Sequence, residues 1–362
     1  MTLKLWVLFQ VSYLAFLGPF TQAVINSAFV PMAKSLHLSV TTASYATTIA
    51  IIGAGVTPLL LSPISNVYGR RPVFILVTAI GIIAHCSSAA APSWRGILAA
   101  RFFVGVGTSA GMGIGAACVA DMFFMHERGR YMGVYTVFVT NGAHVAGMVG
   151  GPIAKYLGWR WCFWIPGIVL GITWLVNLIA LPETLYHRNN ATGQTFQANT
   201  TWLKLFTFNA SAVKRRLTLW DFTHVFVMLK YPSILFPALY YSVAFSIGSV
   251  LFAVTGAAAF GSIYHFVSRQ VLPLLTTFPA DTCQDTVGIG LCIGLPTFIG
   301  TLIGEAFGGS VSDRMLYLYA KAHGGDERPE ARLHATWLGA FLLPAGVIIE
   351  GVTLQYLSLI HI

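Results

Sequence analysis

Long apolar stretches alternate with short polar ones along almost the whole chain. A bilayer core of about 30 Å requires about 20 mostly apolar residues per helix. Glycine and proline inside such stretches do not argue against helix, because both are more frequent in spanning helices than in soluble ones. The pattern therefore predicts an all-α, polytopic membrane protein with about nine spans, near 5–30, 41–61, 73–93, 96–120, 131–154, 161–182, 233–262, 292–311 and 334–356.

The spacing of these spans predicts how the chain is organised. Six spans with short connections form an N-terminal bundle at 1–182, a polar central cytoplasmic loop follows at 183–232, and three spans form a partial C-terminal bundle at 233–356. Within the loop, 217–230 is predicted to form a short interfacial helix. A six-helix block, a basic loop and a second block are typical of a transporter built from two parallel halves.

Composition narrows the class further. Hydrophobic residues make up 56% of the chain and charged residues 9%, whereas ordinary globular domains carry about 25% charged residues. The net charge of +9 indicates basic loops rather than a nucleic-acid partner. Most of the lysines and arginines fall on one side if the N-terminus is cytoplasmic, which is the orientation that the positive-inside rule favours. We expect a multi-pass protein without metal or cofactor, and no enzyme, because no span pairs a nucleophile with a base.

The last six residues, 357–362, read Leu-Ser-Leu-Ile-His-Ile. This string matches the translation of a common sequencing-library adapter, so we expect it to be an artefact and the natural chain to continue. The alternative is a ninth helix that simply ends there.

The stretch between the second and third spans carries the strongest motif, Pro-Ile-Ser-Asn-Val-Tyr-Gly-Arg-Arg-Pro at 63–72. Gly69 permits a tight turn, Arg70 and Arg71 place fixed positive charge in the cytoplasm, and Pro72 suits the first turn of the next helix. The stretch resembles the signature loop of the major facilitator superfamily, and the resemblance covers essentially the whole chain. In that family an acidic residue stands where this chain has Asn66, so the family's charge pairing does not carry over to this position. The alternative is a basic loop that only sets topology.

The resemblance implies a cytoplasmic gate around this loop. In the second half, Asp313-Arg314 echoes the loop at the end of the eighth span and keeps its acid. For Asp121 and Glu127-Arg128, an ordinary solvated loop is the alternative. The gate residues implied are Pro63, Ser65, Asn66, Gly69, Arg70, Arg71, Asp121, Glu127, Arg128, Asp313 and Arg314.

Charged and polar residues inside spans are candidates for the transport path. Arg101 opens a stretch that looks like the family's second motif, Arg-Phe-Phe-Val-Gly-Val-Gly; in proton-coupled relatives this arginine lies at the central cavity and influences proton exchange. The alternative is that Arg101 snorkels to the interface. Gln22 and Asn26, about a turn apart, face a substrate path or bond helix to helix. Glu305 is a candidate protonatable group.

The fifth span is rich in glycine. It is similar to the motif associated with antiport in the drug:proton antiporter branch, although Gly147 stands where that pattern has proline. Small residues there let the helix approach the other half and rock against it. The residues concerned are Gly142, Gly147, Gly150, Gly151 and Pro152.

The resemblance as a whole implies the major facilitator fold, with two pseudo-symmetric six-helix halves of which the second is incomplete, about nine of twelve spans. It further implies a monomeric secondary active transporter of the fungal plasma membrane, in which protons drive export of small organic molecules such as drugs or polyamines. A non-transporting sensor of the same fold, or an inactive fragment, is the alternative, and the loss of the acid at Asn66 is its support.

Overall fold

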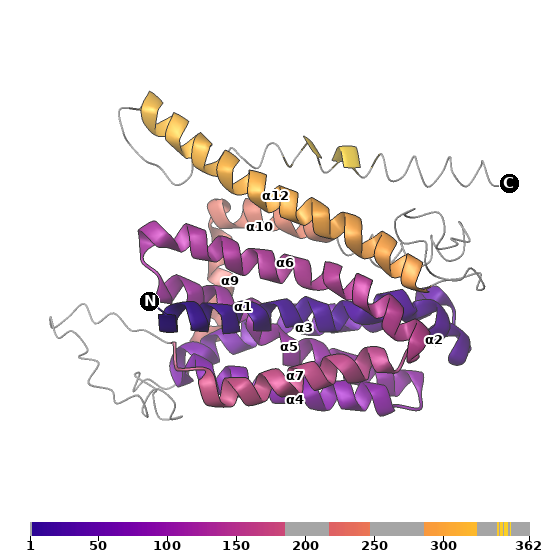
Figure 1. The fold of residues 1–362 in the computed structure, drawn as a ribbon. Helices are drawn as coiled ribbons and strands as arrows, with labels where there is room; N and C mark the ends of the chain where they lie inside the picture. Colours follow the sequence, from indigo (N-terminus) through magenta and orange to yellow (C-terminus); the bar gives the residue numbers. More distant parts are fainter. Residues whose placement is uncertain are drawn as a thin grey trace.

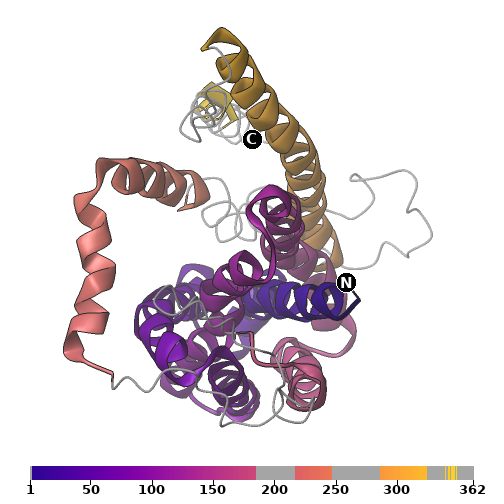
Figure 2. The same ribbon diagram turned by 90° about the vertical axis from the view of Figure 1, so that its left-hand side faces the viewer.

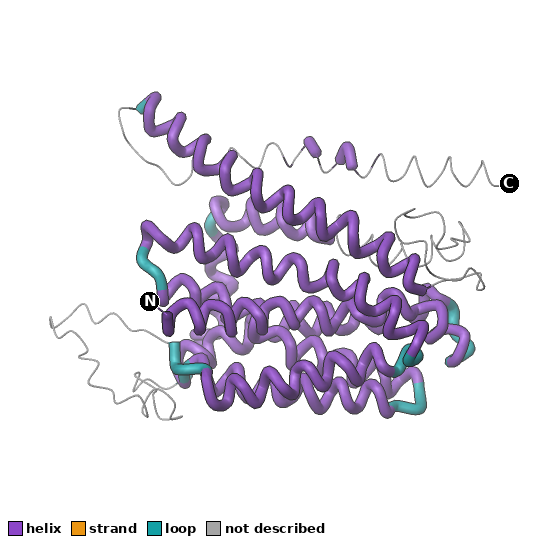
Figure 3. Tube along the Cα trace, in the orientation of Figure 1, coloured by secondary structure: helices purple, strands orange, loops and turns teal. Residues whose placement is uncertain are grey.

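The computed structural model describes residues 2–184, 217–246 and 286–323, with a few isolated positions between 339 and 348. Every element in these ranges is a helix, which confirms the all-α prediction (Figure 3). The elements are α1 (Thr2–Ala23), η1 (Val24–Ala28), α2 (Phe29–Ser35), α3 (Val40–Tyr68), α4 (Arg70–Ala90), α5 (Trp94–Met122), α6 (Met125–Tyr156), α7 (Trp161–Ala180), α9 (Leu219–Val227), η2 (Met228–Lys230), α10 (Pro232–Phe245) and α12 (Thr286–Ala322).

The predicted spans can be compared with these helices. Among the described residues, five helices are long and apolar enough to cross a membrane: Leu3–Ser35, Val40–Tyr68, Arg70–Ala90, Trp94–Met122 and Trp161–Ala180. The predicted spans 131–154 and 292–311 fall within α6 and α12, which are long enough but are not among the five. The span predicted at 233–262 begins with α10 and then leaves the described residues, and the one predicted at 334–356 lies almost entirely outside them.

The first predicted span differs from the structure in one respect. Instead of one helix over 5–30, the chain forms α1, passes through the 3₁₀ segment η1 and continues as α2 to Ser35. All five residues of η1 are buried. Because a 3₁₀ segment has poorer hydrogen-bond geometry than an α-helix, packing against neighbouring helices has to stabilise it here.

Helix α5 lies at the centre of the first six spans, and glycines let its neighbours approach. A Cβ at Gly105 would overlap the backbone of Ala50 on α3, and one at Gly107 would overlap Gly81 on α4. Gly111 meets the backbone of α1 in the same way. The glycine spacing therefore places three helices around α5 at backbone contact, as small residues do in membrane bundles.

Polar residues fix where the helices begin. Ser39 accepts a hydrogen bond from the backbone N–H of Thr42 at the start of α3, and Ser93 does the same for Gly96 at the start of α5. Thr218 forms a capping box with Asp221 at the start of α9. Each of these side chains satisfies an N–H that the first turn of a helix leaves unpaired.

The helices after residue 217 lie on the outside of this bundle. Helix α12 packs along α6, as Figures 1 and 2 show. Helix α9, at Leu219–Val227, falls within the short helix predicted at 217–230. The chain then bends, because Leu219–Lys230 and Ile234–Phe245 meet at an angle of 89°.

Candidate functional site

The turn between α3 and α4 is closed by a carboxylate from far along the chain. Gly69 has φ of +100°, which an L side chain rarely adopts. Its N–H completes α3 by donating to the carbonyl of Ser65. The next two N–H groups, of Arg70 and Arg71, donate to the two oxygens of Glu183, at 2.9 and 3.1 Å. Position 72 is proline and has no N–H, so every N–H at the start of α4 has a partner or is absent.

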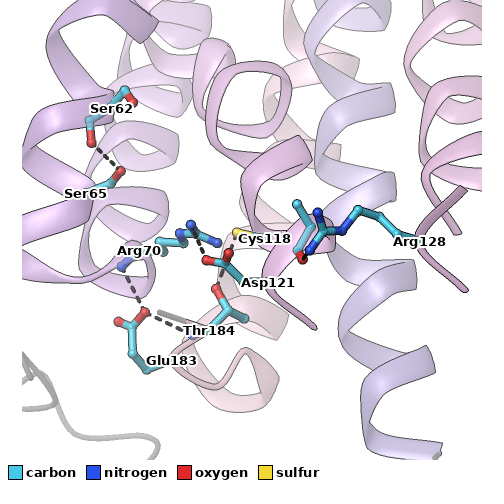
Figure 4. Close-up of polar contacts among 9 residues, drawn as sticks. Ser62, Ser65, Arg70, Cys118, Asp121, Arg128, Glu183 and Thr184 are labelled. Atoms are coloured by element: carbon cyan, nitrogen blue, oxygen red, sulfur yellow. Dashed lines mark hydrogen bonds and ion pairs between the residues drawn. The ribbon is translucent and has the colours of Figure 1, made fainter. Parts of the chain in front are cut away.

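The two arginine side chains of this turn reach different partners, and both are buried. Arg70 forms an ion pair of 2.6 Å with Asp121 at the end of α5 (Figure 4). Arg71 donates to the carbonyl of Leu178 in the last turn of α7, at 2.7 Å. The turn thereby joins the ends of α5 and α7 to α4, and we call Arg70, Arg71, Asp121 and Glu183 the Arg70 cluster.

Glu183 was not among the predicted gate residues, although it contributes most of the bonds. It also accepts from the N–H of Thr184 at 2.9 Å, while the Thr184 hydroxyl donates to the sulfur of Cys118 on α5 at 3.3 Å. A signal was present in the sequence. Glu183 follows the sixth apolar stretch, and in the predicted topology that end lies at the same membrane face as Arg70 and Arg71.

The predicted gate residues next to the Arg70 cluster are buried or half-buried. Pro63 and Ser65 are buried, and Ser65 donates to the carbonyl of Ser62. Arg128 donates to the carbonyl of Ala120 at 2.7 Å and thus ties the loop after α5 together. Glu127 lies in the first turn of α6, where a helix dipole favours an acid.

Asn66 lies on the same turn of α3 but does not join the Arg70 cluster. Its side chain is exposed, and no hydrogen bond joins it to the Arg70 cluster in the described part of the chain. The physical reason is its direction on the last turn of α3, where the neighbours on either side, Ser65 and Val67, take the buried positions. Asp121 and Glu183 supply the negative charge that the motif lacks.

Arg101 is fully buried inside the bundle, which excludes the snorkelling alternative. Its guanidinium donates to three backbone carbonyls, those of Ala46 (3.1 Å), Thr21 (3.3 Å) and Gln22 (2.5 Å). It also stands over the ring of Phe163 on α7, 5.6 Å from the centroid. No carboxylate pairs with it in the described residues. The cation is therefore solvated by helix backbone rather than neutralised.

Gln22 and Asn26 bond helix to helix, which was one of the two alternatives for them. The Gln22 amide donates to the Thr108 hydroxyl on α5 at 3.1 Å, and the Thr47 hydroxyl on α3 donates to the Asn26 side-chain oxygen at 2.7 Å. All four side chains are buried. Together with Arg101 they form a polar layer that joins α1, η1, α3 and α5.

The glycines of α6 serve two different neighbours. A Cβ at Gly142 or Gly150 would overlap the carbonyls of Phe16 and Val24, so these two face α1 and η1. Gly147 faces Gly290 and Gly294 of α12 instead. Gly151 and Pro152 continue α6 beyond these contacts.

The predicted sites of the second half lie on α12, apart from the Arg70 cluster and from the polar layer around Arg101. Glu305 is half-buried and Arg314 is exposed. The main partners of α12 are α6 and η1, and Figure 1 shows α4 on the opposite side of the molecule. The side chain of Asp313 and residues 357–362 lie outside what the structure describes. The described residues also contain no group of three His, Cys, Asp or Glu side chains able to hold a metal ion.

Known proteins match this chain along most of its length. It is 29% identical to the MFS transporter cpaT of Aspergillus oryzae over 97% of the chain and 68% of that protein. It is 27% identical to the efflux pump radE of Floropilus chiversii over 87% of the chain. The chain spans 55–68% of the length of these relatives.

A solved structure agrees on the fold. The xylose transporter XylE from E. coli, in a partially occluded inward-open conformation, aligns with a TM-score of 0.51 at 15% identity, over 88% of this chain and 72% of that one. The family model of the Major Facilitator Superfamily matches residues 11–360. The chain belongs to the Major Facilitator Superfamily.

Proposed function

We propose that this chain is the larger part of a secondary active transporter that exports small organic molecules by alternating access and draws on a proton gradient. Membership of a transporter family supports the first part, and similarity to an efflux pump supports the direction. The observation that carries the proposal is Arg101. Among the described residues its bonded partners are backbone carbonyls, so it keeps its positive charge. That charge disfavours further positive charge nearby, so a proton and a cationic substrate are expected to bind there in alternation rather than together.

The Arg70 cluster acts as the cytoplasmic gate in this proposal, with the N-terminus on the cytoplasmic side. Its bonds join α4 to the ends of α5 and α7 through side chains, and such bonds can break and reform while the helices stay intact. Pro63, Ser65, Arg128 and Glu127 shape the surrounding turns, and Asp313-Arg314 serves the second half.

Helix α6 is the surface on which the two halves rock. The contact between Gly147 and Gly290 brings two backbones together without intervening side chains, which allows sliding at little steric cost. Gly142, Gly150, Gly151 and Pro152 hold α6 to its own half. We assign 1–182 to the first bundle, 183–232 to the connection and 233–356 to part of the second bundle, in a monomer of the plasma membrane.

Flux in proteoliposomes tests the proposal. The reading frame carried past position 356 is expressed, and the product is reconstituted with radiolabelled spermidine and with a panel of cationic dyes. Saturable flux that needs a pH gradient and collapses with a protonophore is expected. Binding of these probes without flux would instead favour the non-transporting sensor.

A further inference from the structure

The 3₁₀ segment η1 interrupts the first membrane span in the interior of the bundle. The span covers Leu3–Ser35, and η1 occupies Val24–Ala28 within it. The N–H of Phe29 donates to the carbonyl of Asn26, three residues back, as the 3₁₀ geometry requires. A 3₁₀ stretch inside a longer helix often marks a functional hinge, so the contacts that hold η1 in this form bear on function.

The change from α-helix to 3₁₀ segment provides carbonyl oxygens for Arg101. N–H groups bond four residues back in an α-helix and three residues back in a 3₁₀ segment, so one carbonyl is passed over where the two forms join. The carbonyls of Thr21 and Gln22 lie at this join, and the Arg101 guanidinium donates to both, at 3.3 and 2.5 Å. A regular α-helix through 24–28 would offer both carbonyls an N–H of its own and would compete with Arg101 for them. The form of η1 and the buried position of Arg101 therefore support each other.

Ser27 ties η1 to α6. Its hydroxyl donates to the carbonyl of Gly147, at 2.9 Å, and the residue is 1% exposed. An α-helix rises about 0.5 Å less per residue than a 3₁₀ segment and turns about 20° less. Conversion of η1 into an α-helix would therefore shift and rotate Ser27 away from Gly147. The bond between them favours the 3₁₀ form.

Helix α12 of the second half lies against the same bond. A Cβ added to Gly290 would overlap the carbonyl of Gly147 and would lie 3.1 Å from the hydroxyl oxygen of Ser27. Ser27 thus lies where η1, α6 and α12 meet. A hydrogen bond that is covered in this way is electrostatically stronger than one in water, and movement of α12 along α6 would remove the cover.

We propose that Ser27 is a positioning residue, which holds η1 in its 3₁₀ form and thereby keeps the carbonyls of Thr21 and Gln22 on Arg101 while α12 covers its own bond to Gly147. When α12 moves along α6, that bond weakens, η1 relaxes towards an α-helix and Arg101 loses carbonyl partners. Contact between the two halves is in this way transmitted to the buried cation. The positioning of Arg101 is a property of this chain, whereas its consequence for transport rests on the proposed function.

Ser88 on α4 supplies a matched control. It is also fully buried, and its hydroxyl donates to the backbone carbonyl of Ala84, at 2.8 Å. That carbonyl lies one turn back on the same helix, so the bond joins no two helices. Serine-to-alanine substitution removes the same hydroxyl at both positions. A difference between the two variants therefore reports on where the bond leads rather than on the loss of a buried hydroxyl.

Chemical modification of arginine tests whether Ser27 acts on Arg101. The purified 362-residue chain in nanodiscs is treated with phenylglyoxal, and the rate of modification at Arg101 is followed by peptide mass spectrometry. Ser27→Ala is expected to raise this rate about fivefold, the effect of one hydrogen bond of ordinary strength, whereas Ser88→Ala should leave it unchanged. Equal rates in the two variants would overturn the proposal. If Ser27→Ala fails to fold, Gly290→Ala replaces it, because its methyl group would press on the same bond from α12.

A double-mutant cycle separates positioning from a merely structural role. Thermal unfolding is measured for the wild type, Ser27→Ala, Arg101→Lys and the double variant. If Ser27 acts through Arg101, its substitution is expected to lower the melting temperature less in the Arg101→Lys background than in the wild type; independent sites would give additive losses, and additivity would overturn the proposal. A chain that shows this coupling but carries no flux after reconstitution would leave the positioning intact and would count against the proposed function instead.

Discussion

The Arg101 site and the Arg70 cluster hold buried cations in opposite ways. Arg101 lies inside the bundle, and its bonded partners are backbone carbonyls of α1 and α3. Arg70 and Arg71 lie at the end of the bundle, where Asp121 and Glu183 bring carboxylates to them. The first site keeps a net positive charge, whereas the second is neutralised.

The difference lies in what must move to release each cation. Carbonyls are fixed by the helices that contain them, so a shift of α1 or α3 relative to α5 breaks the bonds of Arg101. A carboxylate sits on a side chain, and rotation of that side chain breaks the bond. The interior site therefore reports on helix positions. At the end site the carboxylates can leave by rotation of their side chains, whereas the bond from Arg71 to the carbonyl of Leu178 depends on the position of α7.

Removing Arg101 is expected to have the largest effect. The Arg101→Ala variant loses three hydrogen bonds from a charged donor, each worth about 1.5–3 kcal/mol, and is expected to abolish flux driven by a pH gradient. Arg101→Lys keeps the charge, but an ammonium cannot span three carbonyls, so an intermediate rate is expected. Proteoliposome flux and thermal unfolding in detergent measure both. Undiminished flux in Arg101→Ala would contradict the role proposed for Arg101.

Neutralising Glu183 is expected to have the second-largest effect. In Glu183→Gln one oxygen is replaced by an NH₂ group, which cannot accept from the N–H of Arg70 or Arg71. The start of α4 is expected to lose about 1–2 kcal/mol. Hydrogen exchange at these N–H groups would then be roughly tenfold faster, since about 1.4 kcal/mol is a factor of ten. Glu127→Gln makes the same chemical change in the first turn of α6 and should leave α4 unaffected; equal acceleration in both variants would contradict the capping role.

Breaking the pair between Arg70 and Asp121 is expected to have a smaller effect. Arg70 is 4% exposed, whereas Asp121 is 34% exposed and partly in contact with solvent. An asparagine at 121 keeps an oxygen that can accept from Arg70, so the expected loss is about 1 kcal/mol. The loss in Asp121→Asn is expected to shrink as salt rises from about 0.05 to 0.5 M, because salt screens exposed charges. Melting curves at the two concentrations measure this. A loss that is as large as that of Glu183→Gln and independent of salt would show that the two acids act alike.

Restoring the family's acid at position 66 is expected to have the smallest effect of these substitutions on stability and on hydrogen exchange. The side chain of Asn66 is exposed, and surface substitutions of this kind shift stability by about 0.5 kcal/mol or less. Asn66→Asp should therefore match the wild type in both the melting temperature and the exchange rate at Arg70. A slower exchange at Arg70 would place the motif acid within the cluster after all.

The sequence was sufficient to predict the first six helices. Runs of apolar residues have to form helices in a bilayer because backbone groups have no water to bond with, and Gly69 and the serines at 39 and 93 mark breaks. The 3₁₀ segment Val24–Ala28 could not be predicted in this way. Its residues are mostly apolar and small like those around it, and its conformation depends on helices distant in sequence.

The candidate site was predictable only where one residue by itself is costly to place in a membrane span. A charge within a span must find partners, so the burial of Arg101 was predictable, but the identity of its partners was not, since they are carbonyls that any residue offers. The role of Glu183 could be predicted only by someone who knew that α7 ends beside the start of α4. Asn66 was a candidate because of its position in a motif. Its exposure could not be predicted, because a motif does not give the direction of a side chain.

The bonds of Glu183 also have a mechanical consequence. Glu183 and Thr184 follow the last residue of α7, Ala180, by three and four positions, where the covalent connection from the first six helices towards α9 begins. A force along that connection acts on the carboxylate that holds the first turn of α4. The connection thus begins at a residue of the Arg70 cluster rather than within a helix. Tension along it would act on the N–H bonds of Arg70 and Arg71 before it acted on the helices.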